Sequence, residues 1–275
     1  MYWMREKMKT LLITVMMLIS FVSNKSEALK EASISLITLN IWGGHVEAPL
    51  MDFISKNKDI DIFCFQEVYE SAKNKISTND DKVVLDINNK IGNVLSNHYS
   101  YFAPVVNGIY GLSIFFKKDI KVVSHGVYTI HKNDNYPGRG PTHSRILQWI
   151  KISKNNKIYT IANVHGLWNG KGKSDSPNRL KQSRKIREFV DKSKNPVILC
   201  GDFNLTPDTE SLKIISENMV DLIKENKISS TRTSFYKKPI RYADYIFTSA
   251  GVTVEKFKVL EDEVSDHSPI FLKFF

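Results

Sequence analysis

Two turns in the second half of the chain place carboxylate, amide and imidazole groups beside apolar runs. Gly201-Asp202-Phe203-Asn204 follows the apolar run 197–200, and Ser265-Asp266-His267-Ser268-Pro269 precedes the terminal run 270–272. The end of a buried strand is where a rigid sheet can hold polar side chains beside open solvent. Four other expected strand ends carry Asn40, Glu67, His165 and Asp244. Together these segments predict a site for metal-assisted hydrolysis of a phosphate ester.

The oxygen-bearing side chains among these residues suit a hard divalent cation. Magnesium usually keeps several waters and needs only one or two protein carboxylates besides the oxygens of its substrate. Glu67 and Asn40 form the simplest pair of metal-site residues, and Asp266 is expected to contribute from the other side. Manganese accepts the same oxygen ligands, so the sequence does not decide between Mg²⁺ and Mn²⁺.

The Gly-Asp-Phe-Asn turn supplies groups for the attack of water. A carboxylate such as Asp202 can take the proton of a water or orient it, and Asn204 can hydrogen-bond the water or a phosphoryl oxygen. Charge that develops on the ester oxygens is stabilised by preorganised donors together with a metal.

The two histidines are expected at the phosphate. Asp244 is the better partner for His267, because Asp266 is its neighbour along an expected strand and should face the opposite way. The carboxylate would fix the imidazole tautomer and favour its cationic form. His165, at the end of the expected strand 157–164, would give a second contact to the phosphate.

The surrounding pattern predicts an α/β fold. Alternating or continuous apolar runs predict strands at 33–41, 61–65, 111–117, 120–124, 145–152, 157–164, 196–200, 242–248, 252–259 and 269–274. Helices are expected at 49–57, through 84–95 and at 176–192, the last capped by Ser176. No regular element is expected in 131–144. Continuous runs mark strands buried on both faces, which favours a layered sandwich over a barrel.

The first 28 residues differ from the rest of the chain. Three basic residues precede an apolar stretch from Leu11 to Val22, and Ser26-Glu27-Ala28 offers small residues to a signal peptidase. Twelve residues are short for a bilayer-spanning helix, which needs about 20. We therefore expect residues 1–28 to be a signal peptide and 29–275 the mature domain, exported and without a stable membrane span. An uncleaved anchor is the alternative.

Charge and cysteine content narrow the partners. The 275 residues carry a formal net charge of +10, and removing 1–28 takes away four basic and two acidic residues, which leaves +8. That sign fits nucleic acid or an anionic lipid surface, although lysine-rich surfaces also serve only solubility. Cys64 and Cys200 both lie inside apolar runs and are expected to pack as free thiols.

Six short motifs in fixed order identify a family resemblance. They are Leu39-Asn40-Ile41-Trp42, Phe65-Gln66-Glu67-Val68, Asn163-Val164-His165, Gly201-Asp202-Phe203-Asn204, Ala243-Asp244-Tyr245-Ile246-Phe247 and Ser265-Asp266-His267. One such string would be a weak signal, but six in order at expected strand ends are strong. Over about residues 33–275 the chain resembles the endonuclease/exonuclease/phosphatase superfamily, which has the deoxyribonuclease I-like fold.

The resemblance implies a four-layer α/β sandwich of two stacked mixed sheets flanked by helices, with magnesium-dependent phosphoester hydrolysis. Its motifs carry over metal-site roles to Asn40, Glu67 and Asp266, and catalytic roles to Asp202, Asn204, His267, Asp244 and His165. Family members differ over whether the equivalent of Asp202 or of His267 is the base, so both stay open.

Two departures bear on substrate. Pancreatic-type deoxyribonucleases carry an acid in the strand corresponding to 110–116 and a disulfide after the Gly-Asp-Phe-Asn turn, and this chain has neither. Bacterial sphingomyelinases usually have an aromatic residue where Ser268 stands. We expect a monomeric nuclease acting on nucleic acid. A sphingomyelinase-like or inositol-phosphate phosphoesterase is the alternative, and a non-catalytic binding or toxin-subunit module is a third reading.

Other residues are weaker candidates. Trp42 and Trp168 could stack on a base or a lipid headgroup, or pack against the sheet rim. Arg139 lies in a stiff loop that could overhang the site. The remaining histidines are expected on loops or the surface: His45, His98, His125, His131 and His143. A basic track, or only a solvated helix face, is formed by Lys171, Lys173, Arg179, Lys181, Arg184 and Lys185.

Overall fold

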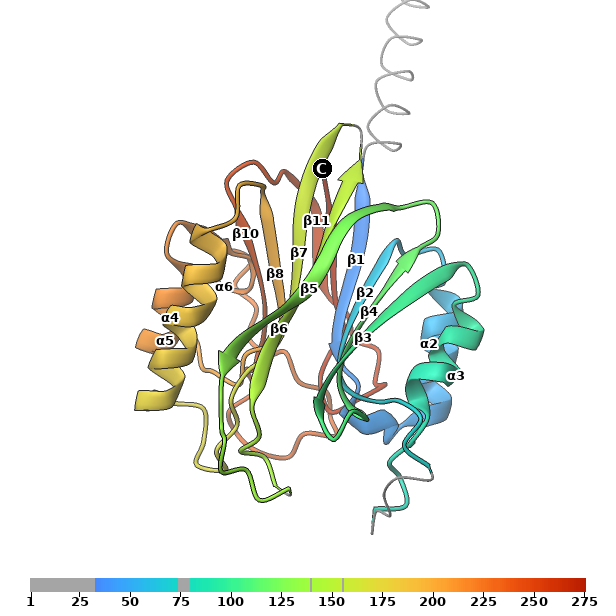
Figure 1. Ribbon diagram of the computed structural model, residues 1–275, viewed down its shortest axis with the longest axis horizontal. Helices are drawn as coiled ribbons and strands as arrows, with labels where there is room; N and C mark the ends of the chain where they lie inside the picture. The colour runs from blue at the N-terminus through green and yellow to red at the C-terminus, as the bar shows by residue number, and fades with distance from the viewer. Residues whose placement is uncertain (1–32, 74–79, 139, 155) are drawn as a thin grey trace, which may run out of the picture.

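Two six-stranded sheets stack face to face in the computed structural model, which describes residues 33–73, 80–138, 140–154 and 156–275 (Figure 1). The expected signal peptide and Arg139 lie outside these residues. The first sheet has the order β11 (Val254–Val259), β12 (Ile270–Phe274), β1 (Ile34–Asn40), β2 (Ile62–Tyr69), β4 (Tyr110–Lys117), β3 (His98–Val106). The second has the order β5 (Lys121–His131), β6 (Arg145–Lys154), β7 (Lys157–His165), β8 (Val197–Asp202), β10 (Asp244–Ser249), β9 (Met219–Asp221).

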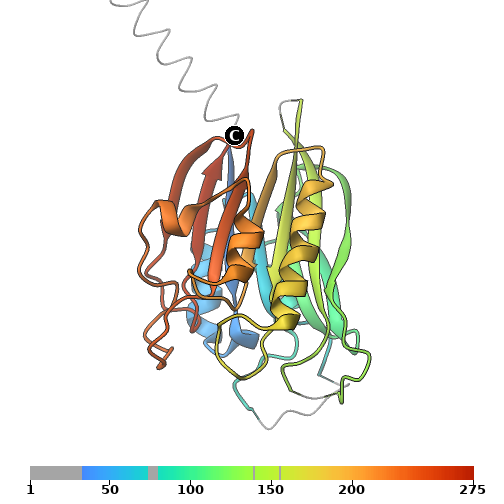
Figure 2. The same cartoon turned by 90° about the vertical axis from the view of Figure 1, so that its left-hand side faces the viewer.

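Helices cover the outer face of each sheet. The 3₁₀ helix η1 (Trp42–Gly44), α2 (Glu47–Lys56) and α3 (Ile87–Val94) belong to the first sheet, and α4 (Pro177–Asp191), α5 (Glu210–Ser216) and α6 (Leu222–Glu225) to the second. Figure 2 shows α4 and α5 in front of the second sheet. The Ser176 side chain accepts a hydrogen bond from the Arg179 N–H, which confirms the expected cap. The expected four-layer α/β sandwich is therefore confirmed.

The two-residue period of β1 explains how both of its faces are buried. Ile34 and Leu36 belong to the core between the sheets, whereas Ile37 and Leu39 pack under α2 and α3. Successive strand residues point to opposite faces, so Asn40 continues the inner row of Ile34 and Leu36. The same alternation carries Cys64 of β2 and Cys200 of β8 to the inner core, where both are free thiols, as expected.

A buried network of side-chain amides joins the two sheets near the ends of β2 and β7. Gln66 Nε2 donates to Asn163 Oδ1 at 2.7 Å, while Asn163 Nδ2 donates to the Phe65 carbonyl at 3.0 Å and to Gln148 Oε1 at 3.2 Å. Gln148 in turn donates to the Tyr101 carbonyl at 2.6 Å. Gln66 Oε1 alone in this network has no partner among the described residues, and such buried hydrogen bonds rigidify a core and fix how its layers pair.

Besides the three-residue η1, four elements were not predicted from the sequence: β3, α5, β9 and α6. β3 is the edge strand of the first sheet, with an exposed outer surface and Pro104 in its interior. Proline is tolerated on an edge strand, where its missing N–H costs no ladder bond, but it obscures the strand pattern. The other three are short, and none of them carries a long apolar run.

Candidate active site

Three strand ends of the second sheet form a row of site residues. Strand pairing sets His165 of β7 opposite Asp202 of β8, and Asp202 opposite Asp244 of β10. Paired residues share one face of a sheet, so all three side chains face the first sheet. Asp202 and Asp244 are 1% and 3% exposed. The continuous apolar run before Asp202 buries β8 on both faces and thereby holds the carboxylate in place.

The first sheet supplies Asn40 and Glu67 at the same end of the molecule. Strict alternation would turn Glu67 away from Asn40, but a bulge interrupts the β2–β4 pairing between Phe65 and Val68. Glu67 has a φ of +57° there, and a bulge of this kind re-aims a side chain. As a result Asn40 Nδ2 donates to Glu67 Oε1 at 2.9 Å and to Asp202 Oδ2 at 3.0 Å, linking the two sheets.

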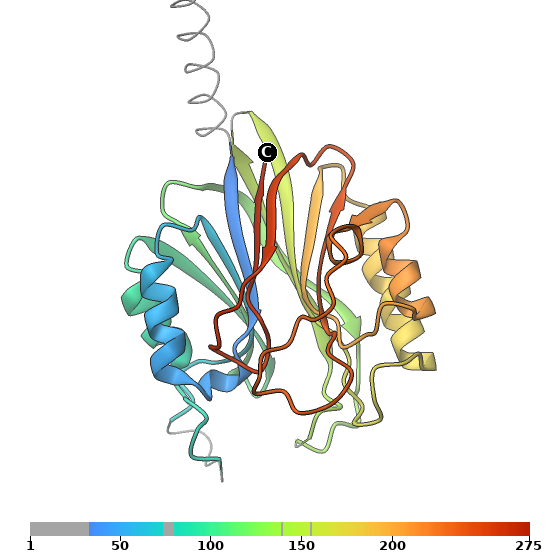
Figure 3. The same cartoon turned by 180° about the vertical axis from the view of Figure 1, so that it is seen from behind.

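The turn before β12 closes the site. Ser265 Oγ donates to the Asn40 carbonyl at 2.7 Å, and Asp266 Oδ2 accepts from Arg232 Nη1 at 2.7 Å. The expectation that Asp266 and His267 face opposite ways is wrong: both line the same cleft, with His267 Nε2 3.7 Å from Asp266 Oδ1. Residues 265–269 form a turn with one isolated bridge rather than a strand, so strand alternation does not apply to them. Figure 3 shows these loops gathered at the end opposite the C-terminus.

Asp244 and His267 form the expected buried pair. His267 Nδ1 lies 2.8 and 2.9 Å from the two Asp244 carboxylate oxygens. Burial raises the pKa of Asp244 to about 6 and, together with Arg232, lowers that of His267 to about 3. The direction of these shifts favours the neutral imidazole over the expected cation. Because the ionised carboxylate only accepts hydrogen bonds, Nδ1 carries the ring proton and Nε2 presents a lone pair 3.6 Å from Asp202 Oδ2.

The turn after β8 ties Asn204 to Asp202. The Asn204 N–H donates to Asp202 Oδ1 at 2.8 Å, and its Nδ2 donates to the Gly166 carbonyl at 3.3 Å. Asn204 has a φ of +54°, a conformation that asparagine tolerates better than most residues. The amide is held next to the Asp202 carboxylate on the wall of the cleft.

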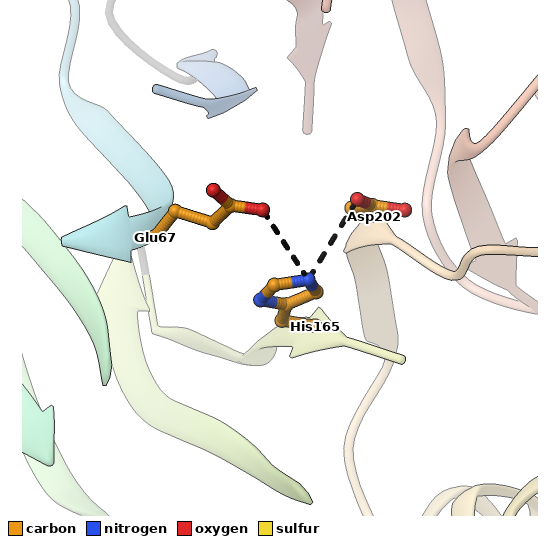
Figure 4. Close-up of side chains that lie close together, drawn as sticks. All are labelled: Glu67, His165 and Asp202. Atoms are coloured by element: carbon orange, nitrogen blue, oxygen red, sulfur yellow. Dashed lines mark ion pairs between the residues drawn. The ribbon is translucent and has the colours of Figure 1, made fainter. Parts of the chain in front are cut away.

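Glu67, His165 and Asp202 converge around one small space (Figure 4). His165 Nε2 lies 3.8 Å from both Glu67 Oε1 and Asp202 Oδ2, and one ligand atom from each residue lies within 4.8 Å of the others. The pKa of Glu67 is raised to about 7, mainly by burial, with the Asn40 hydrogen bond lowering it and the charges of Asp266 and Asp202 raising it.

A divalent cation fits this donor set. Three carboxylates crowd one cleft, and a bound cation would relieve the repulsion that disfavours their ionisation. The residues that would hold it are Glu67, Asp202 and Asp266, all with oxygen donors suited to Mg²⁺ or Mn²⁺. The metal-site role expected of Asn40 stays a prediction, and in this structure its amide is hydrogen-bonded within the protein. Its Oδ1 accepts from the Trp42 N–H at 3.0 Å, so its amide nitrogen, not its oxygen, faces the carboxylates.

Three cationic side chains in the cleft were missed or misjudged from the sequence. Arg145, at the start of β6, is 2% exposed, and its Nε and Nη1 have no hydrogen-bond partner among the described residues. Arg232 binds Asp266 but leaves Nε unpaired in the described part of the chain. Lys173 is 4% exposed, and burial, reinforced by Arg232, lowers its pKa to about 8. Buried cations with unpaired donor atoms, as in Arg145 and Arg232, suit an anionic ligand. Arg145 and Arg232 belong to no sequence motif, so no signal in the sequence indicated their place in the cleft.

Apart from Lys173, the residues of the expected basic track lie outside the cleft. Arg179 is buried and donates to the carbonyls of Leu167, Gly172 and Ser174, so it braces the loop after β7 instead of binding substrate. Lys171, Lys181 and Arg184 are exposed, Lys185 is half-buried, and all four are absent from the cleft lining.

The carboxylates, histidines and cations of the candidate site line one cleft of about 640 Å³ between the loops of the two sheets. Trp42, Trp168 and part of the 131–144 loop lie on its walls, the last as Tyr136, Gly138, Gly140 and Pro141. His45 and His143, two histidines expected on loops or the surface, also line this cleft. His45 is half-buried and stacks on Trp42, and burial lowers the pKa of His143 to about 4. A third, His98, is buried in β3.

Comparison with known proteins agrees with this architecture. The model of the endonuclease/exonuclease/phosphatase family matches residues 37–267. No curated protein matches the chain. Among the described residues, none of the helices has both the length and the apolar character needed to span a bilayer.

Solved structures with this fold include an endonuclease/exonuclease/phosphatase family protein from Bacteroides thetaiotaomicron, with 18% identity and a TM-score of 0.69 over 88% of this chain and 97% of that one. A mannosyl-6-phosphatase from the same organism has 17% identity and a TM-score of 0.66 over 88% and 99% of the two chains. A humanized TDP2 of D. rerio has 16% identity and a TM-score of 0.67 over 89% and 99%. At such low identity these matches establish the fold.

Proposed function

The chain belongs to the endonuclease/exonuclease/phosphatase family, whose members hydrolyse phosphoesters, and we propose that it is a magnesium-dependent phosphodiesterase acting on nucleic acid. The observation that carries the proposal is the meeting of both sheets in one cleft. Glu67 and Asn40 come from the first sheet, and His165, Asp202 and the Asp244–His267 pair face them.

The roles of the side chains follow from their positions. A water held between Asp202 Oδ2 and His267 Nε2, which lie 3.6 Å apart, can pass its proton to either atom. Asp244 keeps the His267 proton on Nδ1, so that Nε2 is the atom that faces the reaction. Asn204 and His165 would orient the phosphoryl oxygens, and Asn40 bridges the carboxylates of Glu67 and Asp202 by donating to both.

The cation would supply electrostatic stabilisation of the charge that develops on the ester oxygens. Glu67, Asp202 and Asp266 would hold it. Arg145, Arg232 and Lys173 add fixed positive charge around the same space, which stabilises an anionic transition state more than the ground state.

Nucleic acid is favoured as substrate by charge. The expected mature chain keeps +8 of the formal charge of +10, and the cleft adds Lys238 to the three buried cations. Cationic surfaces supply most of the affinity for a phosphate backbone. A small phosphoester is the second candidate, because a cleft of about 640 Å³ has the size of sites that enclose small ligands. A lipid phosphodiester and a non-catalytic module stay as outcomes of the test.

We further propose that the protein is exported through residues 1–28 and acts as a monomer. Support for export is the basic, apolar and small-residue order of that segment. Cell fractionation with detection of the N-terminus of the mature chain would test export. Protein found only in the cytoplasm with Met1 intact would refute it.

The activity is tested with a substrate panel. Purified protein is assayed on bis(4-nitrophenyl) phosphate, DNA, RNA, sphingomyelin and an inositol phosphate, with Mg²⁺, Mn²⁺ or EDTA. We expect hydrolysis of the first three with metal and none in EDTA. Asp202→Asn and His267→Ala should abolish turnover without loss of folding. Asp208→Asn, an exposed aspartate outside the cleft, serves as control.

The other results decide between the alternatives. Hydrolysis of sphingomyelin or an inositol phosphate with none of nucleic acid would replace the nuclease by a lipid or small-molecule phosphoesterase. Inertness of the folded protein toward every member of the panel would refute catalysis and favour a binding module.

A further inference from the structure

Aromatic rings line the cleft on both sides of the hydrolytic groups. Trp42 follows β1 and Tyr69 ends β2 in the first sheet, while Trp168 follows β7 of the second and Tyr236 lies in the loop before β10. From this arrangement we propose that the site selects unpaired nucleotides, binding a single-stranded nucleic acid with a base stacked on the rings at each side of the scissile phosphate. The inference rests on the proposed function and adds the strandedness of its substrate.

The ring of Trp42 is held as a fixed platform. His45 stacks parallel to it, with ring centroids 4.3 Å apart and an interplanar angle of 7°. His45 is itself anchored, since its Nε2 lies 2.7 Å from Asp80 Oδ2 and its Nδ1 contacts the Trp42 carbonyl. Trp42 also has a φ of +51°, which is rare for a bulky residue. Backbone strain of this kind persists at sites that use it, here by keeping a large ring at the cleft wall.

The opposite wall combines rings with cations. Lys238 Nζ lies 5.5 Å from the ring centroid of Trp168, and Tyr236 has the Arg232 guanidinium at 4.2 Å and Lys173 Nζ at 5.0 Å. Sites for single strands join a cationic track for phosphates to aromatic side chains on which bases stack. Both components therefore occur on this wall within the same cleft.

A double helix would use these rings poorly. Its base faces are already stacked and paired, and extruding a base costs a few kcal/mol. The cleft volume of about 640 Å³ is that of a site for a drug-sized ligand, which suits a short unpaired segment. Bases of a single strand rotate out freely and can meet the rings from both sheets. The geometry thus favours a single strand even though phosphates alone would attract either form.

Binding in EDTA tests the inference without turnover. Fluorescence anisotropy is measured with a labelled single-stranded oligonucleotide, its duplex, and an abasic strand of equal length. Stacking contributes about 1–3 kcal/mol per base, or about 5- to 150-fold in affinity. We expect the single strand to bind at least about tenfold more tightly than the abasic strand and the duplex. Equal affinity of the three would overturn the inference.

Matched variants assign the effect to the rings. Trp42→Ala and Trp168→Ala should each weaken single-strand binding about 5-fold or more and leave the abasic strand unchanged. Trp42→Phe, which keeps a ring, should restore most of the affinity and guards against misfolding. Tyr99→Ala, an exposed aromatic residue on β3 outside the cleft, should have no effect. Unchanged single-strand binding in both folded tryptophan variants would refute the assignment.

The two proposals fail in different ways. If no ester of the panel is hydrolysed with metal, the catalytic proposal fails regardless of how oligonucleotides bind. If bis(4-nitrophenyl) phosphate is hydrolysed while no oligonucleotide binds, the phosphoesterase stands and the single-strand inference is refuted.

Discussion

The exchange Asp244→Asn would reverse the proton position on His267. The Thr231 hydroxyl donates to Asp244 Oδ2 at 3.0 Å, because its oxygen already accepts from the backbone N–H of Asp244 at 3.3 Å. In the variant the amide oxygen would take the Thr231 proton, which leaves the amide nitrogen facing His267 Nδ1. A donor at that position moves the ring proton to Nε2, the atom that faces Asp202.

The size of the effect follows from the hydrogen bond that is reversed. A hydrogen bond to a charged group contributes about 1.5–3 kcal/mol. Losing it and imposing the opposite tautomer changes the availability of the Nε2 lone pair by about 3–6 kcal/mol, twice that contribution. At 1.36 kcal/mol per factor of ten, kcat should fall about 10²- to 10⁴-fold.

Steady-state hydrolysis of bis(4-nitrophenyl) phosphate with Mg²⁺ measures kcat, and ¹⁵N NMR of the imidazole reports the tautomer. Asp208→Asn makes the same chemical change on the exposed turn and should keep full activity. If Asp244→Asn folds and retains kcat within about threefold, or keeps its ring proton on Nδ1, the role given to the pair is refuted.

Three further predictions concern the metal site, the cleft cation and the joint between the sheets. Because the pKa of Glu67 is raised to about 7, a proton competes with the cation below that pH, so Mg²⁺ affinity should fall about tenfold per pH unit below 7 and level off above it, as calorimetry in two buffers would measure. Arg145→Met removes a buried guanidinium with no ion pair among the described residues, and should raise stability by about 1–4 kcal/mol while kcat/KM falls about 10- to 100-fold. Asn163→Ala breaks the bonds to Gln66, Gln148 and the Phe65 carbonyl at a cost of about 3 kcal/mol, which corresponds to a Tm lower by about 6–12 °C in thermal unfolding.

Each of these has a control and an opposing result. Glu67→Gln should remove the pH dependence of Mg²⁺ binding, and persistence of the dependence would assign it to another group. Arg184→Met, on the exposed side of α4, should change neither stability nor kcat/KM. Activity unchanged in Arg145→Met would show that the guanidinium does not meet the substrate. Exposed Asn135→Ala should leave the Tm alone, and an equal Tm for Asn163→Ala would mean that the sheets do not depend on the network.

The sequence allowed the fold and most of the cleft to be predicted because both depend on local signals. Continuous apolar runs end at Asp202 and near His165, and strand pairing then brings those ends together. The pairing of Asp244 with His267 also followed from residue type and strand ends. Such inferences succeed where a side chain's direction is set by its own strand.

Other features depend on contacts that are distant along the chain. The orientation of Glu67 requires a bulge opposite β4, and the charge state of His267 requires its burial depth, which no local pattern gives. Arg145 at the start of an expected strand and Lys173 in a loop look like ordinary basic residues until the folded chain buries them. Asp266 and His267 were expected on opposite faces only because their segment was taken for a strand.

The row formed by His165, Asp202 and Asp244 has a consequence for folding in vitro. A slip of one residue between β7, β8 or β10 would swing a whole strand's side chains to the other surface of its layer. A molecule paired in that way could be compact and rich in strand, yet it would hydrolyse nothing. Recovery of turnover after dilution from denaturant therefore counts only the chains that have aligned these three strands correctly, which circular dichroism does not distinguish.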